Sequence, residues 1–450
     1  MSAQSLGEQT VDLLGRLVRL GCVNDLTADS GGEERAADLL EEFFAGLPVS
    51  IERITPHPGR TSLVVTVEGA DPSSAGTPLT LLGHTDVVPV DESKWTCDPF
   101  GAQIEDDVMW GRGTVDMLHL TAAMAVVTRQ VARRAQEGNP PARSLVFVAA
   151  ADEEARGGLG VPWIGEHRPD ALPWGAALSE MGGAHIRGRR GGDSVVVVVG
   201  EKGAAQRRLH IRGDAGHGSV PLGRTSAVER LAQVSAALSA ARWPTATDEV
   251  WASFVRAFEF DETTETSLIN GTYEGDYSEF ADLAAFAHAI SHVTVAQTVA
   301  RSGGPINVMP SHAILELDIR TLPGVDDDDV DAAIAAALGD LSEHVTIERL
   351  LSEGATASST DTDLYRVIEA ALTRRYPGAS VVPVLFPGGT DLRVARRRGG
   401  IGYGFGAVDS GASLGQVYSQ LHAHDEHIAL ADVRATAEVL HEVATTYLGA

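Results

Sequence analysis

The sequence predicts an α/β fold into which a smaller α+β domain is inserted, and three observations indicate it. Apolar runs typical of buried strands alternate with helical stretches in both terminal regions, as in a sheet with crossover connections. In the middle, two helical stretches lie between alternating strands, which is typical of a small sheet with helices on one face. At 450 residues, the chain also exceeds the usual size of one hydrophobic core.

The N-terminal region is expected to begin with two helices, because apolar residues recur with helical spacing over residues 11–20 and 33–44. The polar run Asp29-Ser30-Gly31-Gly32 provides a capping region for the second helix. A long Ala-rich helix is expected over 120–137, because Gly138-Asn139-Pro140-Pro141 ends it. Buried strands are expected at residues 62–67, 79–82 and 145–150.

The pattern changes in the middle of the chain and then returns. Strands are expected at 195–199, 207–211, 313–320, 381–386 and 401–405, and helices at 227–240 and 280–290. We therefore assign residues 1–201 and 323–450 to a main domain and residues 202–322 to an inserted segment. The acidic run from Asp326 to Asp329 is interpreted as a solvated helix start and not as a metal site.

Composition excludes several classes of function. The formal net charge of −27 disfavours nucleic acid and anionic membrane surfaces, so neither is expected as a partner. The two cysteines, Cys22 and Cys97, provide neither a disulfide framework nor a cysteine-rich zinc pattern. Neither a signal segment nor an apolar run of transmembrane length is found, so a cytoplasmic location is expected.

Metal-ligand side chains recur in five short polar segments, most of which follow apolar strands. These are His84-Thr85-Asp86, Gly111-Arg112-Gly113 leading to Asp116, Asp152-Glu153-Glu154, Glu180, and His422 with Asp425-Glu426. Sites in α/β sheets form at the carboxyl ends of strands, where such segments meet. A single segment is weak evidence, but the ordered set predicts a two-metal hydrolytic site.

The residue types suggest roles within that site. Imidazole and carboxylate ligands without thiolate suit zinc first, with cobalt and manganese as alternatives. Two metals need a shared carboxylate, for which Asp116 is the candidate. Asp86, two residues beyond His84 on a strand end, is placed to orient the His84 ring. Glu153 and Glu154 are adjacent, so their side chains diverge: one is expected to be a ligand and the other a general base.

Over nearly its whole length the chain resembles the M20 metallopeptidase family, which includes aminoacylases, carboxypeptidases, dipeptidases and succinyl-diaminopimelate desuccinylases. Besides the metal-ligand segments, the resemblance rests on Trp95 with Asp98-Pro99-Phe100, Glu201-Lys202-Gly203, Gly216-His217-Gly218-Ser219, Asn307-Val308-Met309-Pro310 and Gly388-Gly389-Thr390-Asp391. In one departure, Leu118 and His119 occupy positions where many relatives have Lys-Gly.

The resemblance implies a role for each residue of the centre. One metal would be held by His84, Asp116 and Glu180, and the other by Asp116, Glu154 and His422. Glu153 would be the general base that activates a metal-bridging water, and Asp86 the partner of His84. The peptide bond between Asp116 and Met117 is expected to be cis, as in these relatives.

The resemblance also implies a function for each of the two domains. The main domain would be catalytic, and the inserted segment a ferredoxin-like dimerisation domain that contributes His217 to the site of a homodimer. Arg320 and Asn307 would bind the carboxylate end or the scissile carbonyl of the substrate, and Gly389 and Thr390 would offer backbone N–H groups to that carboxylate.

The expected reaction is hydrolysis of an amide or peptide bond next to a free carboxylate, in an N-acyl amino acid, a dipeptide or a peptide C-terminus. Two alternatives are weighed against it. A two-metal aminopeptidase would need a carboxylate that anchors the amino group of the substrate, whereas Arg320 favours a carboxylate anchor. A catalytically silent binding relative would have lost a ligand or the base, but all are present.

Overall fold

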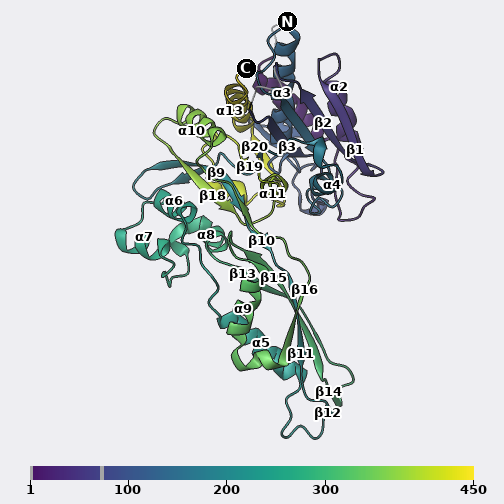
Figure 1. The fold of residues 1–450 in the computed structure, drawn as a ribbon, viewed down its shortest axis with the longest axis vertical. Helices are drawn as coiled ribbons and strands as arrows, with labels where there is room; N and C mark the ends of the chain where they lie inside the picture. Colours follow the sequence, from purple (N-terminus) through teal and green to yellow (C-terminus); the bar gives the residue numbers. More distant parts are fainter. Residues whose placement is uncertain (1–3, 71–75) are drawn as a thin grey trace.

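The computed structural model describes residues 4–70 and 76–450, which form an elongated molecule with two parts and with both termini at one end (Figure 1). Within these residues, the main part contains a ten-stranded sheet with the order β1-β2-β6-β3-β7-β19-β9-β17, to which β18 and β8 are joined through β9. The strands are β1 (Ser50–His57), β2 (Arg60–Val67), β3 (Leu79–His84), β6 (Leu145–Ala150), β7 (Ala176–Ser179), β8 (His185–Arg187), β9 (Asp193–Glu201), β17 (Thr356–Ala357), β18 (Ser380–Phe386) and β19 (Ile401–Gly404).

Helices cover both faces of this sheet, which explains why its central strands are apolar along their whole length. On one face, the helices α1 (Leu6–Val18), α3 (Leu118–Gln136) and α13 (Leu430–Leu448) contact one another and share the largest core cluster. On the other face, α4 (Val161–His167) and α11 (Leu392–Arg397) pack together. None of the helices described is both long and apolar enough to cross a lipid bilayer.

The satellite part consists of a second sheet with helices α5 (Ala227–Ala240) and α9 (Asp327–Leu338) on it. Five antiparallel strands form this sheet in the described residues: β10 (Gly203–Ala204), β11 (Arg207–Arg212), β13 (Thr294–Ser302), β15 (His312–Thr321) and β16 (Val345–Arg349). Along β15, buried and half-buried residues alternate, so one face of the sheet meets the helices and the other faces solvent. The α+β character expected of the insertion is confirmed.

The boundaries predicted for the inserted segment differ from those of the satellite part. Strand β16 pairs with β11, so the second sheet extends beyond residue 322. Between α5 and β13 the chain forms α6 (Glu249–Ala257), α7 (Glu262–Ile269) and α8 (Ala284–Ser291), and α6 contacts β18 of the main sheet. The apolar residues Trp251, Phe254 and Val255 of α6 share a core cluster with Val384 of β18. Burial of these side chains therefore packs α6 on the main part.

Two helix starts test the capping predictions. Asp326 caps α9 and forms a capping box with Asp329, which confirms that the acidic run begins a helix. Helix α2 (Glu34–Phe43), in contrast, has Glu33 at its N-cap position and no side-chain cap from the polar run before it. The Glu33 carboxylate is instead held by Arg60, so a tertiary contact replaces the expected local one.

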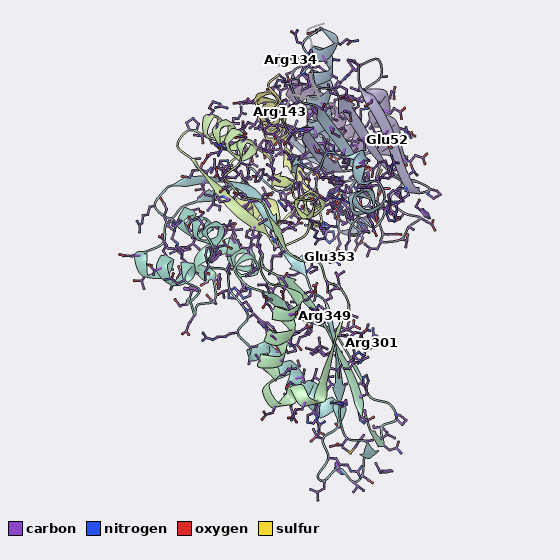
Figure 2. All side chains as sticks on the ribbon, in the orientation of Figure 1. Glu52, Arg134, Arg143, Arg301, Arg349 and Glu353 are labelled. Carbon is purple, nitrogen blue, oxygen red and sulfur yellow. The ribbon has the colours of Figure 1, made fainter. Side chains whose placement is uncertain are left out.

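The satellite part extends far from the main sheet. At its outer end, β12 (Gly216–His217) pairs with β14 (Val308–Met309) (Figure 1). Arg301 and Arg349 lie along the satellite part, and Glu353 lies where the chain returns to the main part (Figure 2). Arg349 bridges to Asp328 and Asp331 of α9, at 2.5 and 2.6 Å, so one arginine connects the sheet to the helix.

Candidate active site

The metal-ligand segments meet at one edge of the main sheet. Strands β3, β6 and β7 run parallel, with β3 between the other two, so their carboxyl ends lie at the same edge. His84 ends β3, Glu153 and Glu154 follow β6, and Glu180 follows β7 directly. These side chains therefore converge because the strands before them are buried and aligned.

Asp116 lies between the two histidines. One carboxylate oxygen, Oδ1, is 3.2 Å from His84 Nε2, and the other, Oδ2, is 3.4 Å from His422 Nε2. On the first side His84 Nε2 is 3.8 Å from Glu180 Oε2, and on the second side His422 Nε2 is 3.1 Å from Glu154 Oε2. The arrangement thus contains two ligand clusters that share the carboxylate of Asp116.

Glu153 lies within the same group of side chains. One of its carboxylate oxygens is within 4.8 Å of ligand atoms of His84 and Glu180. Ligand atoms of His84, Asp116 and Glu154 form a second group within the same limit. Glu153 is therefore close enough to serve either as a base beside the cluster or as a ligand, whereas Glu154 points to His422.

Glu426 holds the Asp116 segment in place. Its Oε1 accepts hydrogen bonds from the backbone N–H groups of Val115 and Asp116, at 2.6 and 3.1 Å. Its Oε2 accepts from Gly113 N–H and the Arg112 guanidinium, at 3.0 and 2.7 Å. The peptide bond between Asp116 and Met117 is cis, as expected. The sequence located Glu426 near His422 but gave it no such role.

Asp86 contacts the His84 ring through its backbone and the neighbouring glutamates through its side chain. The Nδ1 atom of His84 lies 2.9 Å from the backbone carbonyl oxygen of Asp86, whereas the carboxylate is 3.6 Å away. The carboxylate instead accepts from Asn24 Nδ2 and from the backbone N–H groups of Glu153 and Glu154, at 2.9, 3.2 and 3.1 Å. Asp86 therefore positions the two glutamates, because their N–H donors occupy its oxygens.

A buried polar network also holds the segment that carries Glu153 and Glu154. Asp152, in the left-handed region at φ 65°, accepts hydrogen bonds from Asn24, Arg60 and the Leu159 N–H, at 3.1, 2.6 and 2.7 Å. Arg60 also pairs with Glu33 at 2.7 Å, and both of these side chains are almost completely buried. Sequence reasoning missed Asn24, Glu33 and Arg60, because each is an isolated polar residue without a motif.

The carboxylates of the site repel one another in a buried environment. Burial, and then the charge of Asp116, raise the pKa of Glu180 to about 8 and that of Glu154 to about 7. Burial and the Glu180 charge raise the pKa of Glu153 well above its ordinary value. Burial also works against ionised Asp116, but hydrogen bonds from His422 and His84 outweigh it and lower that pKa.

These residues fit divalent cations. The donors are imidazole nitrogens and carboxylate oxygens, the set that zinc and similar ions accept. Glu154 Oε1 is buried and has no hydrogen-bond partner among the residues described, a costly state for a carboxylate oxygen unless a cation meets it. Two cations would also neutralise the mutual repulsion of the acids.

A cavity of about 460 Å³ opens over these residues, and basic side chains are among those that line it. Its lining includes Arg320 and Lys202, together with Arg156, Arg393 and Arg397. Arg320 donates to Asp318 at 2.9 Å and is about one-third exposed. The Lys202 ammonium is occupied by the carbonyls of Ala289 and His292 and by the Thr294 hydroxyl, so Arg320 is the freer of these two cations.

The loop expected to bind the substrate carboxylate is only partly available. Gly388 and Gly389 line the cavity. Thr390 is buried, and both its backbone N–H and its hydroxyl donate to Glu201 Oε2, at 2.6 and 2.7 Å. The expectation that Thr390 offers its N–H to substrate is therefore corrected: Glu201 already accepts it.

His217 and Asn307 lie together, but at the outer end of the satellite part. Strand β12 pairs with β14, and Gly218 N–H donates to the Asn307 carbonyl at 2.7 Å. Both residues are exposed: His217 ends β12 and Asn307 directly precedes β14, and these strands are at the opposite end of the molecule from the termini (Figure 1). Neither residue belongs to the metal-ligand cluster of its own chain.

Comparison with known proteins agrees with this geometry. Probable carboxypeptidase S-like 2 of Dictyostelium discoideum is 27% identical over 342 residues, or 74% of this chain and 64% of that protein. Succinyl-diaminopimelate desuccinylase 2 of Shewanella loihica is 30% identical over 200 residues, or 44% and 51%. The matched regions thus span less than two thirds of either relative.

The fold also matches a solved structure along its whole length. The M20 family metallo-carboxypeptidase of Sulfolobus solfataricus superposes with a TM-score of 0.68 at 19% identity, covering 98% of this chain and 100% of that one. The sequence model of peptidase family M20/M25/M40 matches residues 80–446, a range that includes every candidate ligand from His84 to His422. The chain therefore belongs to peptidase family M20/M25/M40.

Proposed function

We propose that the protein is a metal-dependent hydrolase that cleaves an amide or peptide bond next to a free carboxylate. One observation carries the proposal: the shared-carboxylate cluster around Asp116 and the guanidinium of Arg320 line a single cavity. N-acyl amino acids, dipeptides and peptide C-termini all present an amide close to a carboxylate. A carboxypeptidase and a desuccinylase among the relatives support this class.

In this proposal His84, Asp116 and Glu180 hold one divalent ion, and Asp116, Glu154 and His422 hold the second. Zinc is the first candidate, with cobalt and manganese as alternatives. When bound, such ions supply Lewis acidity, which lowers the pKa of water towards about 7 and polarises a carbonyl.

The chain's own residues perform the proton transfer and hold the substrate. Glu153 accepts a proton from the attacking water and later delivers it to the leaving amine. Asp86 accepts from the backbone N–H of Glu153, and Glu426 accepts from that of Asp116. The carboxylates of Glu153 and Asp116 therefore keep their orientation during turnover. Arg320 binds the substrate carboxylate through two N–H groups, in exchange for part of its contact with Asp318.

His217 and Asn307 act on the site of a second chain in a homodimer. Both lie far from their own metal-ligand residues, and both are exposed (Figure 1). Around them, Val220, Leu222 and Ile306 are 62, 95 and 103% exposed, an unusual concentration of apolar side chains. A partner chain would cover them and receive the two polar residues in its own cavity.

A substrate screen tests the proposal. N-acyl amino acids, dipeptides, and their C-terminal amides would be supplied to the protein with zinc, cobalt or manganese in turn. We expect turnover of the free acids and at least tenfold slower turnover of the matched amides, since the amides lack the anchor for Arg320 (roughly 1.5–3 kcal/mol for a charged hydrogen bond). Preference for substrates with a free amino group and an amidated C-terminus would instead indicate an aminopeptidase.

A further inference from the structure

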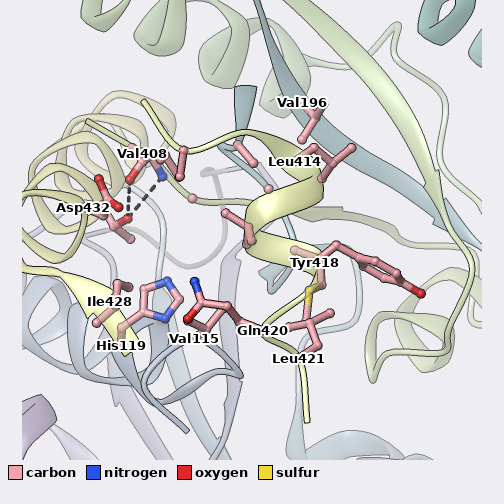
Figure 3. A pocket seen from close by; sticks show the side chains of 18 of the residues that line it. Val115, His119, Val196, Val408, Leu414, Tyr418, Gln420, Leu421, Ile428 and Asp432 are labelled. Carbon is pink, nitrogen blue, oxygen red and sulfur yellow. Dashed lines mark hydrogen bonds between the residues drawn. The ribbon is translucent and has the colours of Figure 1, made fainter. Parts of the chain in front are cut away.

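A second cavity, of about 260 Å³, has a lining that includes Val115, Leu414 and Leu421 (Figure 3). Its walls come from β9, β18, α12 (Leu414–Tyr418), β20 (His427–Ala429) and the start of α13. Three of its lining residues, Val115, Met181 and Leu421, are the sequence neighbours of Asp116, Glu180 and His422. We call it the apolar chamber.

The apolar chamber adjoins the cavity of about 460 Å³ over the metal-ligand residues, which we call the catalytic cavity. Four residues line both: Met181, Phe386, Tyr418 and Leu421. The rings of Phe386 and Tyr418 meet edge to face, with centroids 6.4 Å apart at 78°. A substrate group that extends from the catalytic cavity into the chamber would have to pass these four side chains.

The lining of the apolar chamber suits hydrocarbon. Among the residues described, no lysine or arginine lines it, whereas the catalytic cavity is lined by several. Its polar groups are mostly satisfied: Asp432 accepts from the N–H and hydroxyl of Ser410, at 2.6 and 2.7 Å, and Gln420 accepts from His427 N–H at 3.0 Å. Burial lowers the pKa of His119 to about 4, so this ring is neutral at neutral pH.

We propose that the apolar chamber binds the hydrocarbon chain on the acyl side of the scissile amide, so that N-acyl amino acids with medium-length aliphatic acyl groups are preferred substrates. This inference rests on the proposed function. The scissile carbonyl would lie at the metal-ligand residues, whose sequence neighbours line the chamber, whereas the substrate carboxylate would lie at Arg320. Of the two groups attached to the scissile amide, the acyl chain is thus nearer to the apolar chamber than the amino acid carboxylate is.

The size of the apolar chamber sets the expected chain length. A closed apolar cavity of about 150 Å³ binds benzene. At about 260 Å³, the apolar chamber has room for a longer group, of the order of a hexanoyl to octanoyl chain. Each methylene buried contributes about 0.8 kcal/mol, which corresponds to about a fourfold change in affinity.

Calorimetric binding tests this inference without relying on turnover. The zinc-loaded Glu153→Gln protein would be titrated with N-acetyl-, N-butanoyl-, N-hexanoyl-, N-octanoyl- and N-dodecanoyl-alanine. We expect Kd to fall by about fourfold per methylene up to octanoyl and then to stop falling. A Kd that is the same for all five ligands would overturn the inference.

Variants on α12 locate the effect. Leu414→Trp fills the apolar chamber. The gain in affinity from the acetyl to the octanoyl ligand should therefore disappear, while the acetyl ligand still binds. Val417→Ala enlarges it and should extend the gain to longer chains, which keeps the test valid if Leu414→Trp does not fold. Ser419→Trp, at an exposed position just beyond α12, is the matched control and should leave the profile unchanged. Equal loss for every ligand in Leu414→Trp would refute the chamber assignment.

The outcome for the proposed function is separate. If the wild-type protein hydrolyses no N-acyl amino acid but Glu153→Gln still binds them with the expected length dependence, the proposed function is wrong and the chamber assignment holds. If acetyl and octanoyl substrates are hydrolysed and bound equally well, the proposed function holds and the chamber assignment is wrong.

Discussion

The buried carboxylate of Glu426 offers a quantitative test of how the Asp116 segment is held. The substitution Glu426→Gln preserves the size of the side chain but replaces one accepting oxygen by an NH₂ group. Four N–H donors now point to the two carboxylate oxygens. The amide oxygen should remain with the buried cation of Arg112 and with Gly113, so the NH₂ group would face the N–H groups of Val115 and Asp116.

Two buried donors thus lose their acceptor, at a cost of about 1–3 kcal/mol each, and we expect a total near 4 kcal/mol. Urea unfolding, followed by circular dichroism, measures the free energy of unfolding. The control is Glu438→Gln, because Glu438 also faces an arginine, at 3.1 Å, but its side chain is 51% exposed. This control should lose less than about 1 kcal/mol.

Metal binding gives a second measurement of the same prediction. One of the two donors is the backbone of Asp116, so zinc affinity of Glu426→Gln should fall about 10–100-fold, as for other residues that support metal ligands. If Glu426→Gln unfolds within about 1 kcal/mol of the Glu438→Gln control and binds zinc as the wild type does, Glu426 does not hold this segment.

Three further predictions concern catalysis. Glu153→Gln should reduce kcat by about 10²–10⁴-fold and still bind two zinc ions; a single ion, measured by elemental analysis, would exchange the roles of Glu153 and Glu154. Arg320→Lys should lower kcat/KM by roughly 10–100-fold for free acids and little for their amides, and an equal fall for both would make Arg320 a structural residue. Inactive His217→Ala and Glu153→Gln chains, refolded together, should regain about a quarter of wild-type activity if His217 acts on the partner's site, because about half the dimers are mixed and each has one complete site. No recovery in confirmed mixed dimers would refute that role.

The sequence determined the strands and the side chains that follow them. Residues 145–150 were expected as a buried strand and form β6, because a strand covered on both faces is apolar throughout. His84, Glu154 and Glu180 were candidate site residues because each ends or follows such a strand, and the common direction of the strands brings them together. The family resemblance, and not the strand pattern, favoured Glu154 over Glu153 as a ligand.

The tertiary structure alone decided which distant groups satisfy the buried carboxylates. Glu426 accepts from Gly113, more than 300 residues away in the chain, and Asp152 accepts from Asn24 and Arg60. Thr390 faces Glu201 and not the cavity, and α6 packs on the main sheet although it lies between two segments of the satellite part. No periodicity encodes such pairs, since a buried acid binds whichever donor the packing brings to it, and packing depends on the whole chain.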